Sequence, residues 1–258
     1  MGERYASFTT AMSGSPTPDF HALIRLIETA PDQARDLLRA DPALVEMCSP
    51  HVGETPLHYL AIENRLDAVR MLIALGADVS HRNAFNGTPL LDAASLRCTA
   101  MCELLIGNGA DVDAQDHNHE SPLTTAIRTS QHDLIQRLIV AGANVNLRGS
   151  QGRTPLFYAW DAADDTAFDL LVNAGARLDH RDDRGNTLLD HAIIEADMRR
   201  ALATENDADA DLREAQRIGA LLRRGADAST TNGLGTSADA ELLEVFGMTA
   251  DALMALPD

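Results

Sequence analysis

Few residues that carry chemistry are spaced in this sequence as a catalytic or phosphate-binding site requires. A P-loop needs a lysine, and all 21 residues counted as lysine or arginine are arginine. The glycine-rich run from Gly233 resembles a dinucleotide-binding turn, but no parallel strand is expected before it. Asp207, Asp209 and Asp211 begin like a calcium loop, yet Leu212 stands where that loop needs glycine. We therefore expect a chain that is not an enzyme and binds no cofactor.

Histidines and cysteines offer metal ligands and nucleophiles, but the sequence scatters them. His117 and His119 flank a single residue, whereas a metal site needs three or four convergent ligands, so no metal site is expected. No Ser-His-Asp triad or carboxylate pair can be assigned to facing elements. The cysteines are Cys48, Cys98 and Cys102, an odd number in apolar surroundings, which is not typical of a secreted disulfide framework. We expect a reducing, cytoplasmic compartment.

The formal net charge is −18, with 39 acidic residues against 21 arginines. Such a charge repels phosphate backbones and anionic lipid surfaces, so neither nucleic acid nor membrane is an expected partner. No apolar stretch approaches the length of a membrane span, and the first twenty residues contain no apolar run of signal-peptide length. We interpret the exclusive use of arginine as the mark of a GC-rich bacterial genome.

The elements that must position any functional residue recur every 33 residues. The motif Thr-Pro-Leu-His begins at Thr55, and related motifs begin at Thr88, Ser121, Thr154 and Thr187. A second motif, Gly-Ala-Asp-Val or a close variant, keeps the same spacing and begins at Gly76, Gly109, Gly142 and Gly175. Two motifs in phase indicate a repeat protein.

Each repeat is interpreted as two helices followed by a turn. Thr or Ser caps the first helix, Pro occupies its first turn, where the missing N–H costs nothing, and Leu begins the buried face. A second amphipathic run, such as residues 66–75 or 132–141, ends at a glycine, which readily adopts the left-handed conformation. Polar residues such as 80–87 then project as a hairpin-like finger.

This combination resembles the ankyrin repeat family, whose signature pairs Thr-Pro-Leu-His-x-Ala with Gly-Ala-Asp-Val. The resemblance covers about residues 43–235 and implies an all-α solenoid of stacked helix-turn-helix units with projecting hairpin fingers. Its departures are local. His58 is the only histidine at its motif position, Leu188 replaces proline, and Gly149 replaces the finger aspartate found in two other repeats.

The spacing of the motifs also predicts how the chain is organised. Residues 1–18 are expected to be a disordered N-terminal tail and residues 19–258 a single ankyrin-repeat domain. Within that domain, residues 19–50 form an N-terminal capping repeat, 51–228 five full repeats and 229–258 a C-terminal cap, because terminal repeats need a polar outer face.

One interval breaks the period. Between Gly175 and the last related motif at Gly225 there are 50 residues instead of 33, which predicts an insertion near residues 196–211. The insertion is either a tolerated surface segment, a longer first helix or an exposed acidic loop.

In this architecture fingers and inner helices line a concave surface on which equivalent residues form rows. The candidate partner-binding residues are the inner-helix row Tyr59, Asp92, Thr125, Tyr158 and His191, the finger row Arg82, Gln115, Arg148 and Arg181, and the finger-tip residues Phe85, His117, Asn118, Gln151 and Arg184. Tyrosines there supply contact area with a polar tip.

Some of these positions have two interpretations. Phe85 is either a binding hot spot or an apolar side chain packed onto the next finger. The arginine row either receives carboxylates of a partner or balances finger acids such as Asp116 and Asp182. Trp160, aligned with smaller inner-helix residues, either anchors a ligand or packs between repeats.

These features predict a protein–protein interaction module, a non-catalytic adaptor or inhibitor that binds a partner protein on its concave face as a monomer. The acidic surface favours a partner with a basic surface, reached by electrostatic steering. The alternative is a secreted bacterial effector that acts on host proteins through the same surface, with residues 1–18 as its export signal. An enzyme is a third hypothesis, and the partner cannot be named because a fold fixes a surface and not its target.

Overall fold

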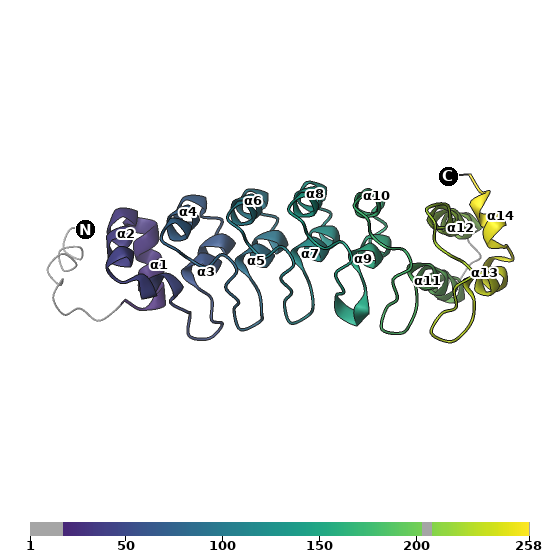
Figure 1. The fold of residues 1–258 in the computed structure, drawn as a ribbon, viewed down its shortest axis with the longest axis horizontal. Coiled ribbons are helices and arrows are strands. Elements are labelled where there is room, and N and C mark those ends of the chain that lie inside the picture. Colours follow the sequence, from purple (N-terminus) through teal and green to yellow (C-terminus); the bar gives the residue numbers. More distant parts are fainter. Residues whose placement is uncertain (1–17, 203–207, 258) are drawn as a thin grey trace. The chain divides into compact units, whose positions relative to one another are not determined.

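The structure is a computed structural model that describes residues 18–202 and 208–257. Within these ranges the chain forms helices and turns and no strand, so the expected all-α class is confirmed. None of the helices in the described ranges is long and apolar enough to cross a membrane. The chain divides into two compact units, unit 1 (Met1–Asp111) and unit 2 (Val112–Asp258) (Figure 1). Residues 1–17 of the expected tail lie outside the described residues.

Unit 1 consists of helix pairs that pack on one another. Its elements are α1 (Phe20–Thr29), α2 (Pro31–Ala40), the 3-10 helix η1 (Pro42–Glu46), α3 (Pro56–Ile62), α4 (Leu66–Ala74), α5 (Pro89–Ser95) and α6 (Thr99–Gly107). The inner helix α3 packs on both α1 and α5, and the outer helix α4 packs on α6. In Figure 1 the inner helices lie between the outer helices and the projecting fingers.

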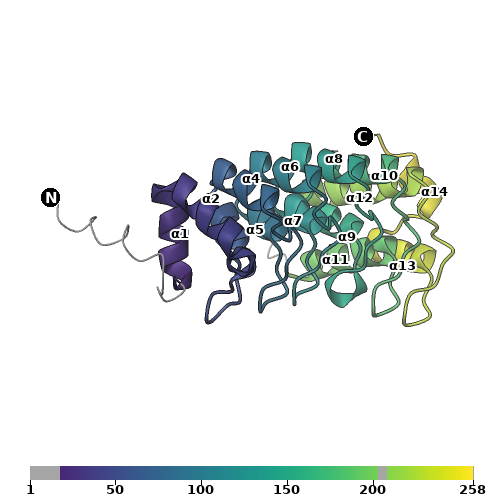
Figure 2. The same ribbon diagram turned by 60° about the vertical axis from the view of Figure 1, so that its left-hand side comes forward.

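Unit 2 repeats this arrangement with longer helices near its end. Its elements are α7 (Pro122–Arg128), α8 (His132–Val140), the 3-10 helix η2 (Ser150–Gly152), α9 (Pro155–Asp161), α10 (Asp165–Asn173), α11 (Leu188–Leu202), α12 (Ala208–Arg223), α13 (Ala238–Phe246) and α14 (Ala250–Met254). The inner helix α7 packs on α9 and α11 packs on α13, while α8 packs on α10 and α12 on α14. Figure 2 shows the fingers of this unit leaving the same side of its helices.

The repeated motifs form the helix ends. The hydroxyl of Thr88 accepts a hydrogen bond from the N–H of Leu91 at 3.3 Å, and the hydroxyl of Ser121 accepts one from Thr124 at 3.2 Å. The glycines that follow the outer helices have φ between 85° and 98°, which a side chain would strain; they are Gly76, Gly109, Gly142, Gly175 and Gly225. In the repeats that begin at Thr88 and Ser121 the two motifs therefore cap both ends of the helix pair.

Most fingers close through an aspartate or asparagine. The N–H of Asp116 donates to the carbonyl of Glu120 at 3.1 Å, and Asp116 Oδ1 accepts the Glu120 N–H at 2.9 Å. The same pair of bonds forms at Asn83, Asp182 and Asn232. Gly149 has no such side chain, and its finger instead forms η2 with Gln151 at φ 59°. The departure seen in the sequence thus changes one turn and leaves the helices in place.

The insertion lengthens two helices of unit 2. The helices α11 and α12 have 15 and 16 residues, whereas α9 and α10 have 7 and 9. Arg199 lies 2.7 Å from Glu214, and Arg200 lies 3.5 Å from Asp211, so ion pairs join the lengthened ends. The longer first helix is the interpretation that the structure supports, and residues 203–207 of the insertion lie outside the described residues.

Candidate functional site

The inner-helix row in unit 1 contains Tyr59 on α3 and Asp92 on α5, both half-buried. The Tyr59 ring packs edge-on against Phe20, with 6.2 Å between the ring centroids. Asp92 Oδ2 is buried and has no hydrogen-bond partner. Burial, together with the charge of Glu54, raises the pKa of Asp92 to about 6. A buried carboxylate oxygen without a donor is costly, so this group would gain from a cation supplied by another molecule.

The two predicted finger contacts of unit 1 differ in the interactions that they make within the chain. Phe85 is 62% exposed, which favours the hot-spot interpretation over packing onto the next finger. Arg82 lies 3.4 Å from Asp111 Oδ2, and its Nη1 donates to the carbonyl of Asn86 at 3.4 Å. Phe85 is therefore an apolar side chain open to contact, whereas Arg82 already pairs within its own unit.

The inner-helix row in unit 2 is less accessible. Thr125 on α7 and His191 on α11 are each only 8% exposed, and Tyr158 on α9 is half-buried. Burial and the charge of Glu120 raise the pKa of Tyr158 above its ordinary value. The sequence placed all three in one binding row, and in unit 2 Tyr158 is the member of that row with the most open side chain.

The finger row in unit 2 is joined by bonds within the chain. Gln115 Nε2 donates to the carbonyl of Arg148 at 2.8 Å, Arg148 lies 2.7 Å from Asp183, and Arg181 donates to the carbonyl of Thr231 at 2.7 Å. These bonds link neighbouring fingers. They support the charge-balance interpretation of the row, and a role in partner binding stays a prediction.

The remaining predicted contact residues lie at finger tips of unit 2. His117, Asn118, Gln151 and Arg184 are all exposed. The N–H of Asn118 donates to Asp116 Oδ1 at 2.8 Å, and this bond fixes the backbone while the His117 imidazole stays open. These side chains are available for contact, but no geometry brings them together into one site.

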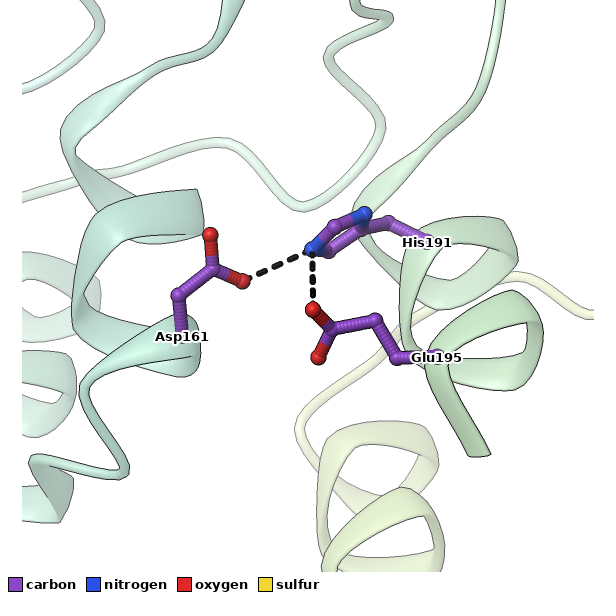
Figure 3. A group of neighbouring side chains, drawn as sticks. All are labelled: Asp161, His191 and Glu195. Atoms are coloured by element: carbon purple, nitrogen blue, oxygen red, sulfur yellow. Dashed lines mark hydrogen bonds and ion pairs between the residues drawn. The ribbon is translucent and has the colours of Figure 1, made fainter. Parts of the chain in front are cut away.

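A cluster that the sequence analysis missed lies between α9 and α11 (Figure 3). His191 Nε2 lies 2.7 Å from Asp161 Oδ1 and 3.7 Å from Glu195 Oε1. One ligand atom from each of the three residues lies within 4.8 Å of the others, so the group could hold a metal ion. His191 and Glu195 are four residues apart on one helix face, and that spacing was a signal that the sequence offered.

Two arginines pair with the carboxylate oxygens of this cluster that do not face His191. Arg153 lies 3.1 Å from Asp161 Oδ2, and Arg199 lies 2.9 Å from Glu195 Oε2. Each carboxylate thus directs one oxygen toward His191 and the other toward a guanidinium group. This chain of polar contacts accounts for the geometry without a metal, and it holds His191 in place.

Trp160 on α9 is buried at 6% exposure. The guanidinium of Arg217 lies 4.2 Å from its ring centroid, and the same side chain donates to the carbonyl of Trp160 at 3.0 Å. The Phe168 ring lies edge-on at 6.4 Å. These contacts with α10 and α12 favour the packing interpretation over a ligand anchor.

Comparison with known proteins agrees with this geometry. A family model described as ankyrin repeats in three copies matches residues 28–116, 90–182 and 123–214, which together cover most of the chain. The chain belongs to the ankyrin repeat family. It is 39% identical over 70 residues to the serine/threonine-protein kinase VIK of Arabidopsis thaliana, which is 27% of this chain and 16% of the kinase. It is 51% identical over 37 residues to the ankyrin repeat protein OPG189 of Monkeypox virus, which is 14% of this chain and 7% of the viral protein.

Ankyrin repeats generally act as protein–protein interaction modules, and the fold is typically non-catalytic. Because the matched segments are small fractions of both relatives, they report the repeats and not the rest of those proteins. In this ankyrin-repeat chain, the accessible side chains of the fingers and inner helices are the candidate contacts. Among them, unit 1 contributes the half-buried Asp92, whose Oδ2 has no hydrogen-bond partner, and the exposed Phe85 ring.

Proposed function

We propose that the chain binds a protein partner through the finger and inner-helix face of unit 1, and that an arginine or lysine of the partner pairs with Asp92. The observation that carries the proposal is Asp92 Oδ2, a buried carboxylate oxygen with no hydrogen-bond partner. Because Asp92 as a whole is only half-buried, a cation of the partner that covers its open side would offset the charge of this carboxylate, and Glu54 adds a second negative charge nearby. Tyr59, one repeat earlier on α3, adds an aromatic surface with a polar tip.

Phe85 supplies the apolar part of this surface. At 62% exposure its ring would lose most of its remaining contact with water when a partner covers it. Exposed aromatic side chains beside charged groups are common hot spots in protein interfaces. The net charge of −18 adds long-range attraction for a basic partner, which raises the rate of association and makes it depend on salt.

The binding is stoichiometric, as in an adaptor or inhibitor of the cytoplasm, and needs no cofactor. The same charge opposes association with nucleic acid or with an anionic membrane surface. The partner is therefore expected to be a protein that presents a basic residue close to an apolar pocket or groove, and the chain is expected to act as a monomer.

Affinity capture from a lysate of the source cells, at low salt, tests the proposal. The immobilised chains are wild type, a variant with Asp92→Asn and Phe85→Ala, and the control Val140→Ala, which truncates an apolar side chain that is 83% exposed at the end of α8. We expect a protein that wild type and the control recover and the double variant loses. Recovery by all three chains, or by none, contradicts the proposal.

A further inference from the structure

Cys48 and His81 occupy equivalent positions in adjacent repeats of unit 1, 33 residues apart. Stacking of the repeats therefore sets the two side chains side by side, with 3.9 Å between Cys48 Sγ and His81 Nε2. Cys48 is exposed, so a small molecule can approach its sulfur. An exposed thiol beside an imidazole has the first two parts of an activated nucleophile.

Glu46 supplies the third part. Its Oε2 lies 3.2 Å from His81 Nδ1, and its Oε1 accepts the N–H of Asp78 at 2.7 Å. The backbone of the next repeat thus fixes the carboxylate beside Nδ1, while Nε2 of His81 faces the sulfur. The thiol and the carboxylate therefore lie at different nitrogens of the ring, which is the order of groups in nucleophile, base and positioning acid arrangements.

We propose that Cys48 is a reactive thiol that exchanges with low-molecular-weight disulfides, with His81 as its general base and Glu46 as a positioning residue. This goes beyond partner binding and does not depend on it. As the Cys48 sulfur attacks one sulfur of the disulfide, its proton passes to His81 Nε2. A new S–S bond forms, the old S–S bond breaks, and the leaving thiolate takes the proton, so the products are a mixed disulfide at Cys48 and one free thiol.

The surroundings keep His81 free for this role. His58 meets the His81 ring edge-on, with 5.8 Å between centroids. Burial lowers the pKa of His58 to about 4, so His58 is neutral at physiological pH and adds no positive charge. The acids near the two histidines are Glu46 and Asp78.

The other two cysteines are controls within the same chain. Cys98 is half-buried and its sulfur lies 3.7 Å from the carbonyl of Leu96. Cys102 is buried in α6, and burial raises its pKa to about 12. Neither has a histidine contact of the kind that Cys48 has among the described residues, so their rates report accessibility and folding and not activation by a base.

The test measures mixed-disulfide formation with glutathione disulfide on the full chain, resolved for each cysteine by mass spectrometry. At pH 7 we expect Cys48 to react at least about tenfold more slowly in His81→Asn than in wild type, with Cys98 unchanged. By pH 9.5 the difference should close, because ordinary thiols ionise there without a base. Glu46→Gln, which keeps the imidazole, should slow Cys48 by about threefold at pH 7.

Added imidazole separates chemistry from structure. In His81→Ala it should restore the rate at Cys48 and leave Cys98 as it was. Cys102 should stay unreacted in every folded variant. If Cys102 reacts in His81→Asn, that variant is partly unfolded, and the Cys48 rates in Glu46→Gln and with added imidazole then test the proposal. Equal Cys48 rates at pH 7 in wild type and all three variants would overturn the proposal, as would a slowed Cys48 that neither imidazole nor pH 9.5 restores.

Discussion

In unit 1 the inner-helix row contains Asp92, whose Oδ2 has no hydrogen-bond partner, whereas in unit 2 the same row contains His191 with carboxylates on two sides. The finger rows differ less, since Arg82 and Arg148 both pair with an aspartate of their own unit. Unit 1 also exposes Phe85 at a finger tip. Equivalent positions of one repeat thus have unlike electrostatic surroundings in the two units.

The difference shows how a repeat protein separates stability from binding. In the unit 2 row the carboxylate oxygens of Asp161 and Glu195 face His191 on one side and Arg153 or Arg199 on the other, so these contacts add to stability and offer little to a partner. Buried carboxylate oxygens without a hydrogen-bond partner also occur in unit 2, at Asp190 and Glu241, so the contrast concerns this row and not the whole unit. In unit 1 the unsatisfied carboxylate costs stability and gains from a partner. Mutations in the two units should therefore act on different measurable quantities.

The largest expected effect on stability is in unit 2. His191→Ala removes a buried ring that lies 5.6 Å from the Phe157 centroid and leaves the inner oxygen of Asp161 without its donor. We expect a loss of about 3 kcal/mol in the free energy of unfolding. Urea denaturation, monitored by hydrogen exchange in residues 155–195, measures this loss of stability. A loss below about 1 kcal/mol would mean that the network is not structural.

A smaller effect of opposite sign is expected in unit 1. The pKa of Asp92, raised to about 6, means that the folded state binds its proton more tightly than the unfolded chain does. Its contribution to stability is therefore present at low pH and lost as the pH rises through about 6. Asp92→Asn removes this penalty and should stabilise unit 1 by about 1 to 2 kcal/mol at pH 7.5.

That gain should disappear toward pH 4, where Asp92 carries its proton in wild type. Urea denaturation of both chains across this pH range gives the comparison. A variant that is less stable than wild type at pH 7.5 would show that Asp92 has a structural partner, and the contrast between the units would fail at this residue.

The smallest effect is expected where the finger row is exposed. Arg148 and Asp183 form a pair at 2.7 Å with about half of each side chain open to water. We expect Arg148→Ala to cost about 0.5 kcal/mol in the free energy of unfolding, and less in 1 M salt, because water and ions screen the pair. A cost above about 1.5 kcal/mol would place the fingers of unit 2 among its main stabilising elements.

Much of the fold could be predicted because the repeat encodes it locally. Thr88 and Ser121 cap helices through their own side chains, and Gly76 ends an outer helix because its φ of 93° suits glycine. These are effects of nearest neighbours in the chain. Because the period is 33 residues, the same caps could be predicted in each following repeat.

The sites were harder to predict because they depend on contacts between repeats. Alignment of the repeats predicted that Thr125 and His191 are accessible, but their side chains are buried. Asp161 meets His191 across 30 residues of sequence, through side-chain orientations that spacing alone does not fix. Cys48 and His81 were in phase with the period, so alignment of that row offered a signal for their contact.

The central claim is that unit 1 carries the partner-binding face. Hydrogen–deuterium exchange of the full chain, alone and saturated with the captured partner at pH 7.5, tests it most directly. Binding at unit 1 should slow exchange in residues 82–95 and 54–62, which contain Phe85, Asp92 and Tyr59, and change it little in residues 153–199. Protection confined to residues 153–199, with none around Phe85 and Asp92, would contradict it.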